Sequence, residues 1–275
     1  MTDPAAVPVN GASLAVADGS LHYTLSGHGP VVVFAHGLGG NHRSWWQQVP
    51  YFAQRYTCLN FSHRGFAPSR DDVTGQPSPQ RFADDLTRLL DHLDFERVSI
   101  VAQSMGGWTA MEFALRAPDR LTSLVLSGST GTLRHPGLAS LGATGGDPTI
   151  RRLRARGVHP AAGERMAREQ PELHRLFADI DRSSGEWDRD AVRAALDAMR
   201  VRDPDELRAV RCPVLALVGA EDVVCPPANV EILASGPLRV SVTTVPRAGH
   251  SVYFERSAKF NEIVRNFLRD AEVNG

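Results

Sequence analysis

One short stretch of the chain, Val101–Gly107, constrains the fold more than any other. The β-branched and apolar residues that lead into it are typical of a buried strand, whereas Trp108–Ala117 carries apolar residues at helical spacing. A strand can turn into a helix over so few residues only through a sharp bend with small residues on both sides of its apex, here Ala102 and Gly106. We therefore expect Ser104 to stand at the apex with its hydroxyl exposed.

Strand and helix signals alternate along most of the chain. Apolar or β-branched runs favour strands at Ser13–Ala17, Leu21–Ser26, Val31–Ala35, Thr57–Phe61, Val98–Ala102, Leu121–Ser127, Pro213–Val218 and Val240–Val245. Apolar residues at helical spacing favour helices at Ser44–Ala53, Pro79–Leu93, Asn229–Ala234 and Ser257–Ala271. This alternation predicts an α/β fold with a mostly parallel sheet of eight strands flanked by helices.

The pattern changes between residues 128 and 210. Short helical pieces rich in Arg and Asp follow one another there, and Gly and Pro separate them. We therefore expect a core domain made of residues 1–127 and 211–275, with residues 128–210 inserted as a helical cap.

Composition limits the partners of this chain. The 30 basic and 31 acidic residues give a formal net charge of −1, which supplies no electrostatic case for nucleic acid or an anionic membrane. The three cysteines, Cys58, Cys212 and Cys225, are too scattered for a disulfide framework or a metal cluster. The N-terminus lacks a basic segment followed by an apolar one, and no run approaches 18 apolar residues. We expect a cytoplasmic monomer or homodimer that acts on a small molecule without a cofactor or metal.

Ser104 needs partners to act as a nucleophile. A serine hydroxyl is weak at neutral pH, so it requires a base within hydrogen-bond reach and a carboxylate that orients this base. We prefer His250 among the ten histidines because it follows the last expected strand and so lies at the same edge of the sheet as Ser104. Asp222 follows the preceding strand and is the preferred carboxylate, with Glu221 as the fallback. The predicted triad is Ser104, His250 and Asp222.

A serine nucleophile also requires two N–H donors for the oxyanion that forms during attack. Met105 can supply one, because it follows Ser104 at a helix N-terminus where the dipole favours negative charge. Leu38 can supply the other from the glycine-rich stretch that follows the strand Val31–Ala35. Around the substrate pocket we expect Gly37, Gln103, Trp108 and Ser129.

Together these motifs resemble those of the α/β-hydrolase superfamily. The matching features, in the order serine, acid and histidine, are His36-Gly37-Leu38-Gly39, Arg64-Gly65, Ala102-Gln103-Ser104-Met105-Gly106, Gly219…Asp222 and Gly249-His250. The resemblance covers nearly the whole chain apart from the cap. It implies the α/β-hydrolase fold and hydrolysis by a serine nucleophile.

The chain departs from the family pattern at two places. Ala102 replaces the first glycine of the elbow, which is sterically acceptable. Ser62 and Ala67 stand where the family usually has Asp and Gly, so we expect looser hydrogen bonding in that turn but little effect on catalysis.

Several other residues could have either a structural or a functional role. His36 and His63 fit structural roles in their turns better than the role of a second base. Trp45 and Trp46 fit core and rim positions better than a pocket. The run Arg151–Arg156 fits a solvated helix face better than a site for a substrate carboxylate. Nothing pairs Cys225 with a base, so its thiol is expected to be passive.

The first hypothesis is a serine hydrolase that cleaves a small carboxylic ester or lactone through an acyl-enzyme. The second is hydrolysis of a carbon–carbon bond in a dienoate, because the region around Ser104 also resembles ring-cleavage-product hydrolases. Those enzymes typically carry Asn and Trp where this chain has Gln103 and Ser251. The third is a ligand receptor that keeps the fold and the triad but turns over slowly.

Overall fold

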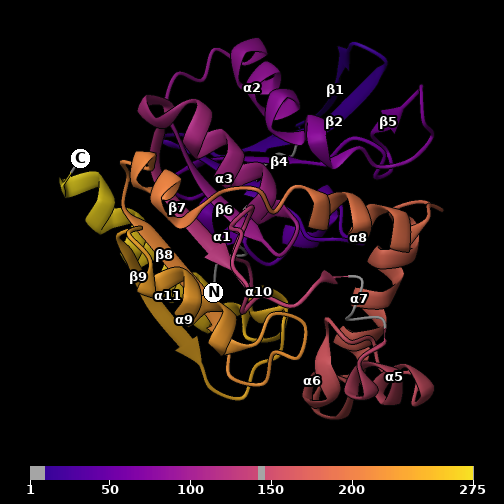
Figure 1. Cartoon of the computed structure of the whole chain (residues 1–275). Helices are drawn as coiled ribbons and strands as arrows, with labels where there is room; N and C mark the ends of the chain where they lie inside the picture. The colour runs from indigo at the N-terminus through magenta and orange to yellow at the C-terminus, as the bar shows by residue number, and fades with distance from the viewer. Residues whose placement is uncertain (1–9, 142–145, 275) are drawn as a thin grey trace, which may run out of the picture.

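The structure, a computed structural model, describes residues 10–141 and 146–274. In this part of the chain the sheet has nine strands: β1 (Asn10–Val16), β2 (Gly19–Ser26), β3 (Val31–Ala35), β4 (Thr57–Phe61), β5 (Arg70–Asp71), β6 (Val98–Gln103), β7 (Leu121–Ser127), β8 (Val214–Gly219) and β9 (Val240–Val245). Their order is β1-β2-β4-β3-β6-β7-β8-β9, and β5 pairs with β2 off this path (Figure 1).

The predicted mostly parallel sheet is confirmed. Every neighbouring pair from β4 to β9 is parallel, and only the pairs that involve β2 are antiparallel among the described strands. The sequence predicted eight strands and missed β5, because a strand of two residues is too short to show an alternating pattern.

Helices cover both faces of the sheet. One face packs against α2 (Phe82–His92), α3 (Gly106–Arg116) and α9 (Pro227–Ser235). The opposite face packs against α1 (Val49–Phe52), α10 (Val252–Glu255) and α11 (Ser257–Asn274). Successive side chains of a strand point to opposite faces, so Val33 belongs to the first core and Val32 and Phe34 belong to the second.

The continuous helix predicted over Ser44–Ala53 is wrong. A 3-10 helix, η1 (His42–Trp45), comes first, and α1 follows as a separate turn. Pro50 lies at the start of α1 and has no N–H to donate to the carbonyl group of Trp46, so one helix cannot run through both. Further 3-10 turns are η2 (Pro79–Arg81), η3 (Pro118–Arg120) and η4 (Pro204–Ala209).

The segment expected as a cap lies between β7 and β8. Its helices with given bounds are α5 (Pro148–Ala155), α6 (Gly163–Glu169), α7 (Pro171–Ser183) and α8 (Arg189–Ala198). They stand to one side of the sheet in Figure 1. Val192 and Leu196 of α8 pack against Phe66, Met105 and Trp108 of the core, so the cap rests directly above the bend at Ser104.

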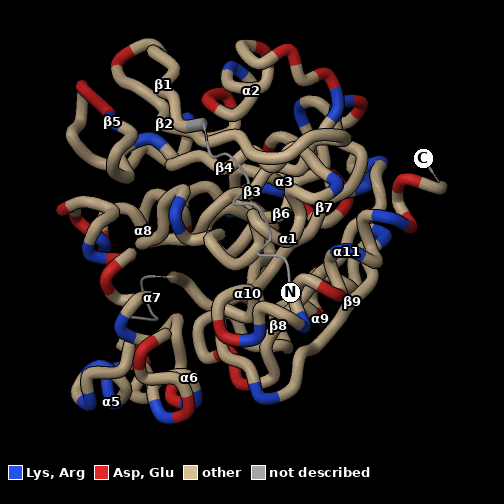
Figure 2. The backbone as a smooth tube through the Cα atoms, turned by 180° about the vertical axis from the view of Figure 1, so that it is seen from behind, with Lys and Arg blue, Asp and Glu red and all other residues tan. Residues whose placement is uncertain are grey.

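The surface carries both signs of charge. Figure 2 shows basic and acidic residues interspersed on α6 and α11, whereas α5 carries basic residues without acidic ones. Among the described residues, no helix combines the length and the apolar character that a membrane span requires. Residues 1–9, which make up most of the N-terminal stretch without a basic segment followed by an apolar one, lie outside the described residues. The cytoplasmic location stays a prediction.

Candidate active site

Ser104 lies at the bend between β6 and α3. Its φ of 49° belongs to the left-handed region that residues other than glycine rarely adopt, so the bend is strained. Its N–H donates to the Ser127 carbonyl oxygen at 2.9 Å. A Cβ on Gly106 would lie 2.3 Å from the carbonyl oxygen of Ala35, so only glycine fits there. The bend therefore has the strained apex and the small neighbour that the sequence predicted.

His250 and Asp222 form a buried pair beside this bend. His250 Nδ1 donates to Asp222 Oδ2 at 2.7 Å, and both residues are 3% exposed. The other carboxylate oxygen, Asp222 Oδ1, accepts the backbone N–H groups of Val224 and Cys225, each at 2.8 Å. These bonds fix the carboxylate, and the carboxylate fixes the proton on Nδ1. Nε2 of His250 is left as the nitrogen that can accept a proton.

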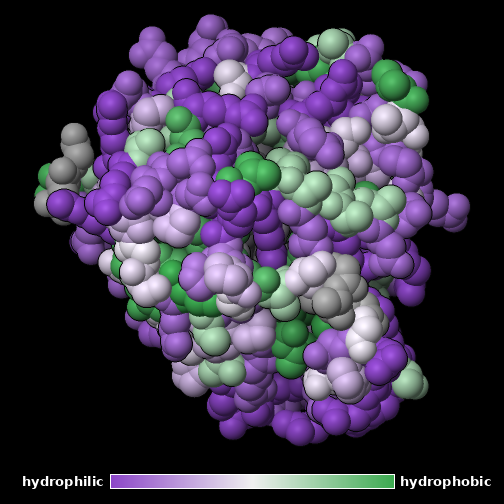
Figure 3. Space-filling model, in the orientation of Figure 1, coloured by the Kyte–Doolittle hydropathy of each residue, from purple (hydrophilic) through white to green (hydrophobic). Residues whose placement is uncertain are grey.

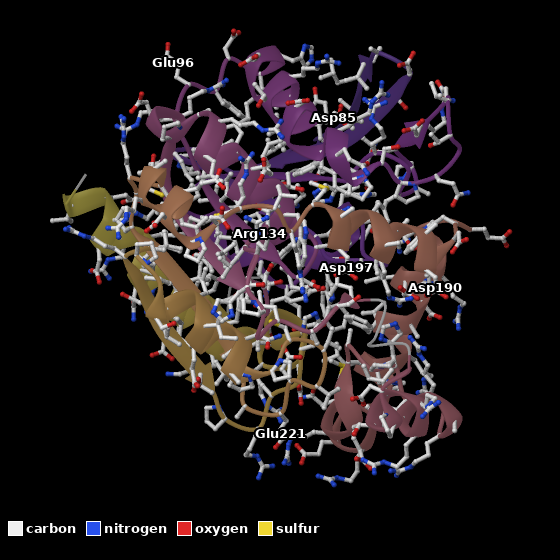
Figure 4. All side chains as sticks on the ribbon, viewed as in Figure 1. Asp85, Glu96, Arg134, Asp190, Asp197 and Glu221 are labelled. Atoms are coloured by element: carbon white, nitrogen blue, oxygen red, sulfur yellow. The ribbon has the colours of Figure 1, made fainter. Side chains whose placement is uncertain are left out.

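Glu221, the fallback carboxylate, lies elsewhere. Its side chain is 42% exposed and accepts hydrogen bonds from Arg165 of α6, the shortest at 2.6 Å. Figure 4 shows Glu221 at the periphery of the molecule, next to the cap. The structure thus brings Asp222, and not Glu221, to His250.

Two backbone N–H groups are free near Ser104. The N–H of Leu38 and the N–H of Met105 have no protein acceptor among the described residues. Met105 directly precedes the first turn of α3, so its N–H lies at the positive end of the helix dipole. Both residues line the same cavity as Ser104. The arrangement fits two donors for a developing oxyanion.

Ser104 opens onto two cavities that meet at its side chain. The larger has a volume of about 600 Å³, and its wall includes Leu38, Met105 and residues of α5, α7 and α8. The smaller has a volume of about 340 Å³, and its wall includes His250 and the start of α9. Figure 3 shows hydrophobic side chains at the surface between the core and helices α5 and α6. The nucleophile thus sits between two spaces of small-molecule size.

The four expected pocket residues divide into two groups. Trp108 lies in the wall of both cavities, and Ser129 lies in the wall of the smaller one. Gly37 and Gln103 line neither, which corrects the sequence-based expectation; they surround a void of only about 10 Å³. A Cβ on Gly37 would lie 1.9 Å from Gln103 Oε1, so these two residues pack against each other behind the site.

His36 and His63 have structural roles. His36 Nδ1 donates to the Gly37 carbonyl oxygen at 2.8 Å, and its Nε2 accepts the backbone N–H of His63 at 2.9 Å. Complete burial lowers the pKa of His36 to about 3, so the ring is neutral near pH 7. His63 forms a hydrogen bond with Thr109 Oγ1 at 2.9 Å. His36 has no ring nitrogen left to act as a base.

The structure also shows where the tryptophans, the arginine run and Cys225 lie. Trp45 is completely buried in the core, and Trp46 is exposed. In the arginine run, Arg154 lines the larger cavity, whereas Arg156 pairs with Glu164 at the surface. Burial raises the pKa of the Cys225 thiol, so little thiolate is present near neutral pH.

The turn that departs from the family pattern is well bonded. Ser62 Oγ accepts the backbone N–H of His42 at 3.2 Å, and Ser69 Oγ donates to the Ser62 carbonyl oxygen at 2.7 Å. Arg64 and Asp85 form a buried ion pair beneath it, at 2.6 and 2.8 Å. The hydrogen bonding that we expected to be loose is therefore replaced by serine hydroxyls.

Sequence reasoning missed three residues near the triad. Gly128 has a φ of 57°, and a Cβ there would lie 3.0 Å from the His250 ring. Glu255 accepts the Gly249 N–H at 2.7 Å and so holds the loop that carries His250. Arg200 lines the smaller cavity from the end of the cap. The glycine at the end of a strand was a readable signal for Gly128, but the other two depend on tertiary contacts.

Comparisons with known proteins agree with the geometry. Residues 30–164 match the family model for the alpha/beta hydrolase fold. A 3-oxoadipate enol-lactonase from Acinetobacter baylyi is 26% identical over 94% of this chain and 96% of its own length. Est816, an N-acyl homoserine lactone degrading enzyme, is 26% identical with a TM-score of 0.79, over 93% of this chain and all of its own. A malate-bound thermophilic esterase from Thermogutta terrifontis is 25% identical with a TM-score of 0.73, over 96% and 99% of the two chains. The chain has the α/β-hydrolase fold and is a hydrolase.

Proposed function

We propose that this hydrolase cleaves a small carboxylic ester or lactone through an acyl-enzyme on Ser104. The observation that carries the proposal is that a strained serine, a buried His250–Asp222 pair at 2.7 Å and two N–H groups without an acceptor among the described residues lie around the same two adjoining cavities. Each part supplies one requirement of acyl transfer: a nucleophile, an oriented base and an oxyanion hole.

The proposed reaction has two halves. Ser104 Oγ attacks the substrate carbonyl carbon while His250 Nε2 takes the hydroxyl proton, and the N–H groups of Leu38 and Met105 bind the oxyanion. The carbonyl re-forms as the alkoxy group leaves with the proton from His250, which gives the acyl-enzyme. Water then attacks the acyl carbon, His250 takes its proton and returns it to Ser104, and the carboxylic acid leaves.

Two related activities support the choice of bond. The enol-lactonase and the homoserine lactone degrading enzyme both act on lactones, and the Thermogutta protein is an esterase. The two cavities have the volumes expected for small substrates. Cleavage of a dienoate carbon–carbon bond stays an alternative, as does a slow ligand receptor.

The test compares the wild type with Ser104→Ala on p-nitrophenyl acetate, p-nitrophenyl butyrate, γ-butyrolactone and a dienoate ring-cleavage product. We expect ester or lactone turnover in the wild type and a loss of about 10⁴-fold or more in kcat for the variant. A fluorophosphonate should label the wild type alone. If the wild type were no faster than the variant on every ester and lactone and Ser104 were not labelled, the proposal would be wrong. Faster cleavage of the dienoate would favour the carbon–carbon alternative.

A further inference from the structure

The two cavities at Ser104 differ in which part of the catalytic machinery they contain. Leu38 and Met105, the proposed oxyanion donors, line the larger cavity, and His250 lines the smaller. In the proposed mechanism His250 gives its proton to the leaving oxygen, so the leaving group lies on the side of His250. The smaller cavity is therefore the site for the alkoxy part of the substrate, and the larger cavity is the site for the acyl part. This assignment rests on the proposed function.

Arg200 stands in the wall of the smaller cavity, and it is the one arginine there among the described residues. Its side chain is only 12% exposed, and its guanidinium carbon lies 5.4 Å from the centre of the Trp108 ring. Nη1 donates to the Ala139 carbonyl oxygen at 2.7 Å. Nε is buried without a hydrogen-bond acceptor, and Nη2 has none among the described residues. The guanidinium group thus makes a single hydrogen bond among the described residues.

The carboxylates near this cavity accept their hydrogen bonds from groups other than Arg200. Asp197 Oδ1 forms an ion pair with Arg200 Nε at 3.9 Å, which is too long for a hydrogen bond, and its carboxylate accepts hydrogen bonds from the Ser140 hydroxyl and the Leu141 N–H. Asp147 caps α5 by accepting the N–H groups of Thr149 and Ile150. Asp222 holds His250. A buried cation without a hydrogen-bonded carboxylate is costly, and burial lowers the pKa of Arg200.

We propose that Arg200 binds a carboxylate on the leaving-group side of the substrate. The guanidinium group has paired N–H donors that match a carboxylate in shape and charge, and its carbon lies over the Trp108 ring. The substrate class is then an ester of a hydroxy acid, or a lactone whose alkoxy side carries a carboxylate.

Three acetyl or phenyl esters separate the two sides of the site. In 4-acetoxybenzoate the carboxylate is on the leaving group, in methyl 4-acetoxybenzoate it is masked, and in monophenyl succinate it is on the acyl group. We expect Arg200→Met to lower kcat/KM for 4-acetoxybenzoate by about 30-fold or more and for the other two by less than about threefold. Arg200→Lys keeps the charge and should retain part of the preference. Arg211→Met, a change at an exposed arginine paired with Asp119, should leave all three unchanged.

A binding experiment gives an answer that does not depend on turnover. Calorimetry with the Ser104→Ala protein compares 4-hydroxybenzoate with its methyl ester, and Arg200→Met is then added to the same background. We expect the carboxylate to bind at least about tenfold more tightly, and this preference to disappear with Arg200→Met. Equal binding of the two ligands with Arg200 intact would overturn the inference even if Arg200→Met failed to fold, and so would an equal loss of kcat/KM on all three esters. Absence of any ester turnover would overturn the proposed function instead.

Discussion

The core and the cap contribute different kinds of residue to the same site. The core supplies Ser104, Asp222 and His250 from loops at the ends of β6, β8 and β9. The cap supplies much of the cavity wall, from α5, α7 and α8. Buried parallel strands fix where their ends lie, whereas the cap helices are placed by packing and ion pairs. In the proposed mechanism the bond-breaking groups therefore belong to the core, and much of the wall that contacts the substrate belongs to the cap. We expect the cap to unfold more easily than the core.

The largest expected effect is a loss of kcat, and it should follow from the replacement of one carboxylate oxygen in the core. In Asp222→Asn the amide oxygen would keep the N–H bonds from Val224 and Cys225, so the amide nitrogen would face His250 Nδ1. His250 would then carry its proton on Nε2, the wrong tautomer for a base, and kcat should fall about 10⁴-fold. Steady-state assays on p-nitrophenyl acetate measure this loss.

The neighbouring acid gives the matched control. Glu221→Gln removes the charge that faces Arg165 at the surface, so it should leave kcat unchanged. Comparable losses in the two variants would show that the loop as a whole, and not the hydrogen bond to His250, matters for activity.

The same contrast explains what could be predicted from sequence. The strand runs before Ser104, Asp222 and His250 are apolar and β-branched, and their alternation with helices fixes which ends meet at one edge of the sheet. Leu38 and Met105 follow from this placement, because they are defined by backbone position and not by side chain. The position of Arg200 in the cavity wall could not be predicted, because it depends on how the cap packs against the core. Gly37 and Gln103 were misplaced because adjacency in sequence to Leu38 and Ser104 does not show which way a residue faces.

The second effect concerns the stability of the core in acid. His36 is buried and neutral, with a pKa of about 3 in the folded state against 6.5 for an ordinary histidine. Between about pH 3 and 6.5 the His36 ring is therefore protonated in the unfolded chain and neutral in the folded chain. The stability that the buried neutral ring contributes is complete above pH 6.5 and is lost as the pH falls toward 3. The limiting slope is about 1.4 kcal/mol per pH unit for this residue. Urea unfolding at pH 4, 5, 6 and 7 measures it.

His36→Gln is the informative variant, because an amide can donate to the Gly37 carbonyl and accept from the His63 N–H as the ring does. It should reduce the slope of the unfolding free energy with pH by about 1.4 kcal/mol per pH unit, which corresponds to one proton. His28→Gln, at an exposed position, should leave the slope unchanged. Parallel curves for the wild type and His36→Gln would show that the ring at this position is not the group that titrates on unfolding.

The smallest effect should appear in the cap. Asp181 of α7 binds both terminal nitrogens of Arg189 on α8, at 2.7 and 3.1 Å, and its carboxylate packs against Gly39 beside Leu38. Burial alone would raise the pKa of Asp181, but its interactions with nearby His159 and with Arg189 outweigh burial, and the pKa is lowered. The pair therefore stabilises the cap above about pH 4 and loses this contribution as the pH falls through the lowered pKa.

Asp181→Asn keeps the shape and removes the charge, so it should weaken the cap by about 1–2 kcal/mol and leave the core unaffected. Hydrogen exchange should show faster exchange in α8 and unchanged exchange in β6 and β8, and the difference from wild type should disappear in acid. Asp190→Asn, which removes an exposed partner of Arg193, should change neither region. If exchange rose equally in cap and core, the two would unfold as one cooperative unit, and the separation of a rigid catalytic core from a less constrained cap would have to be abandoned.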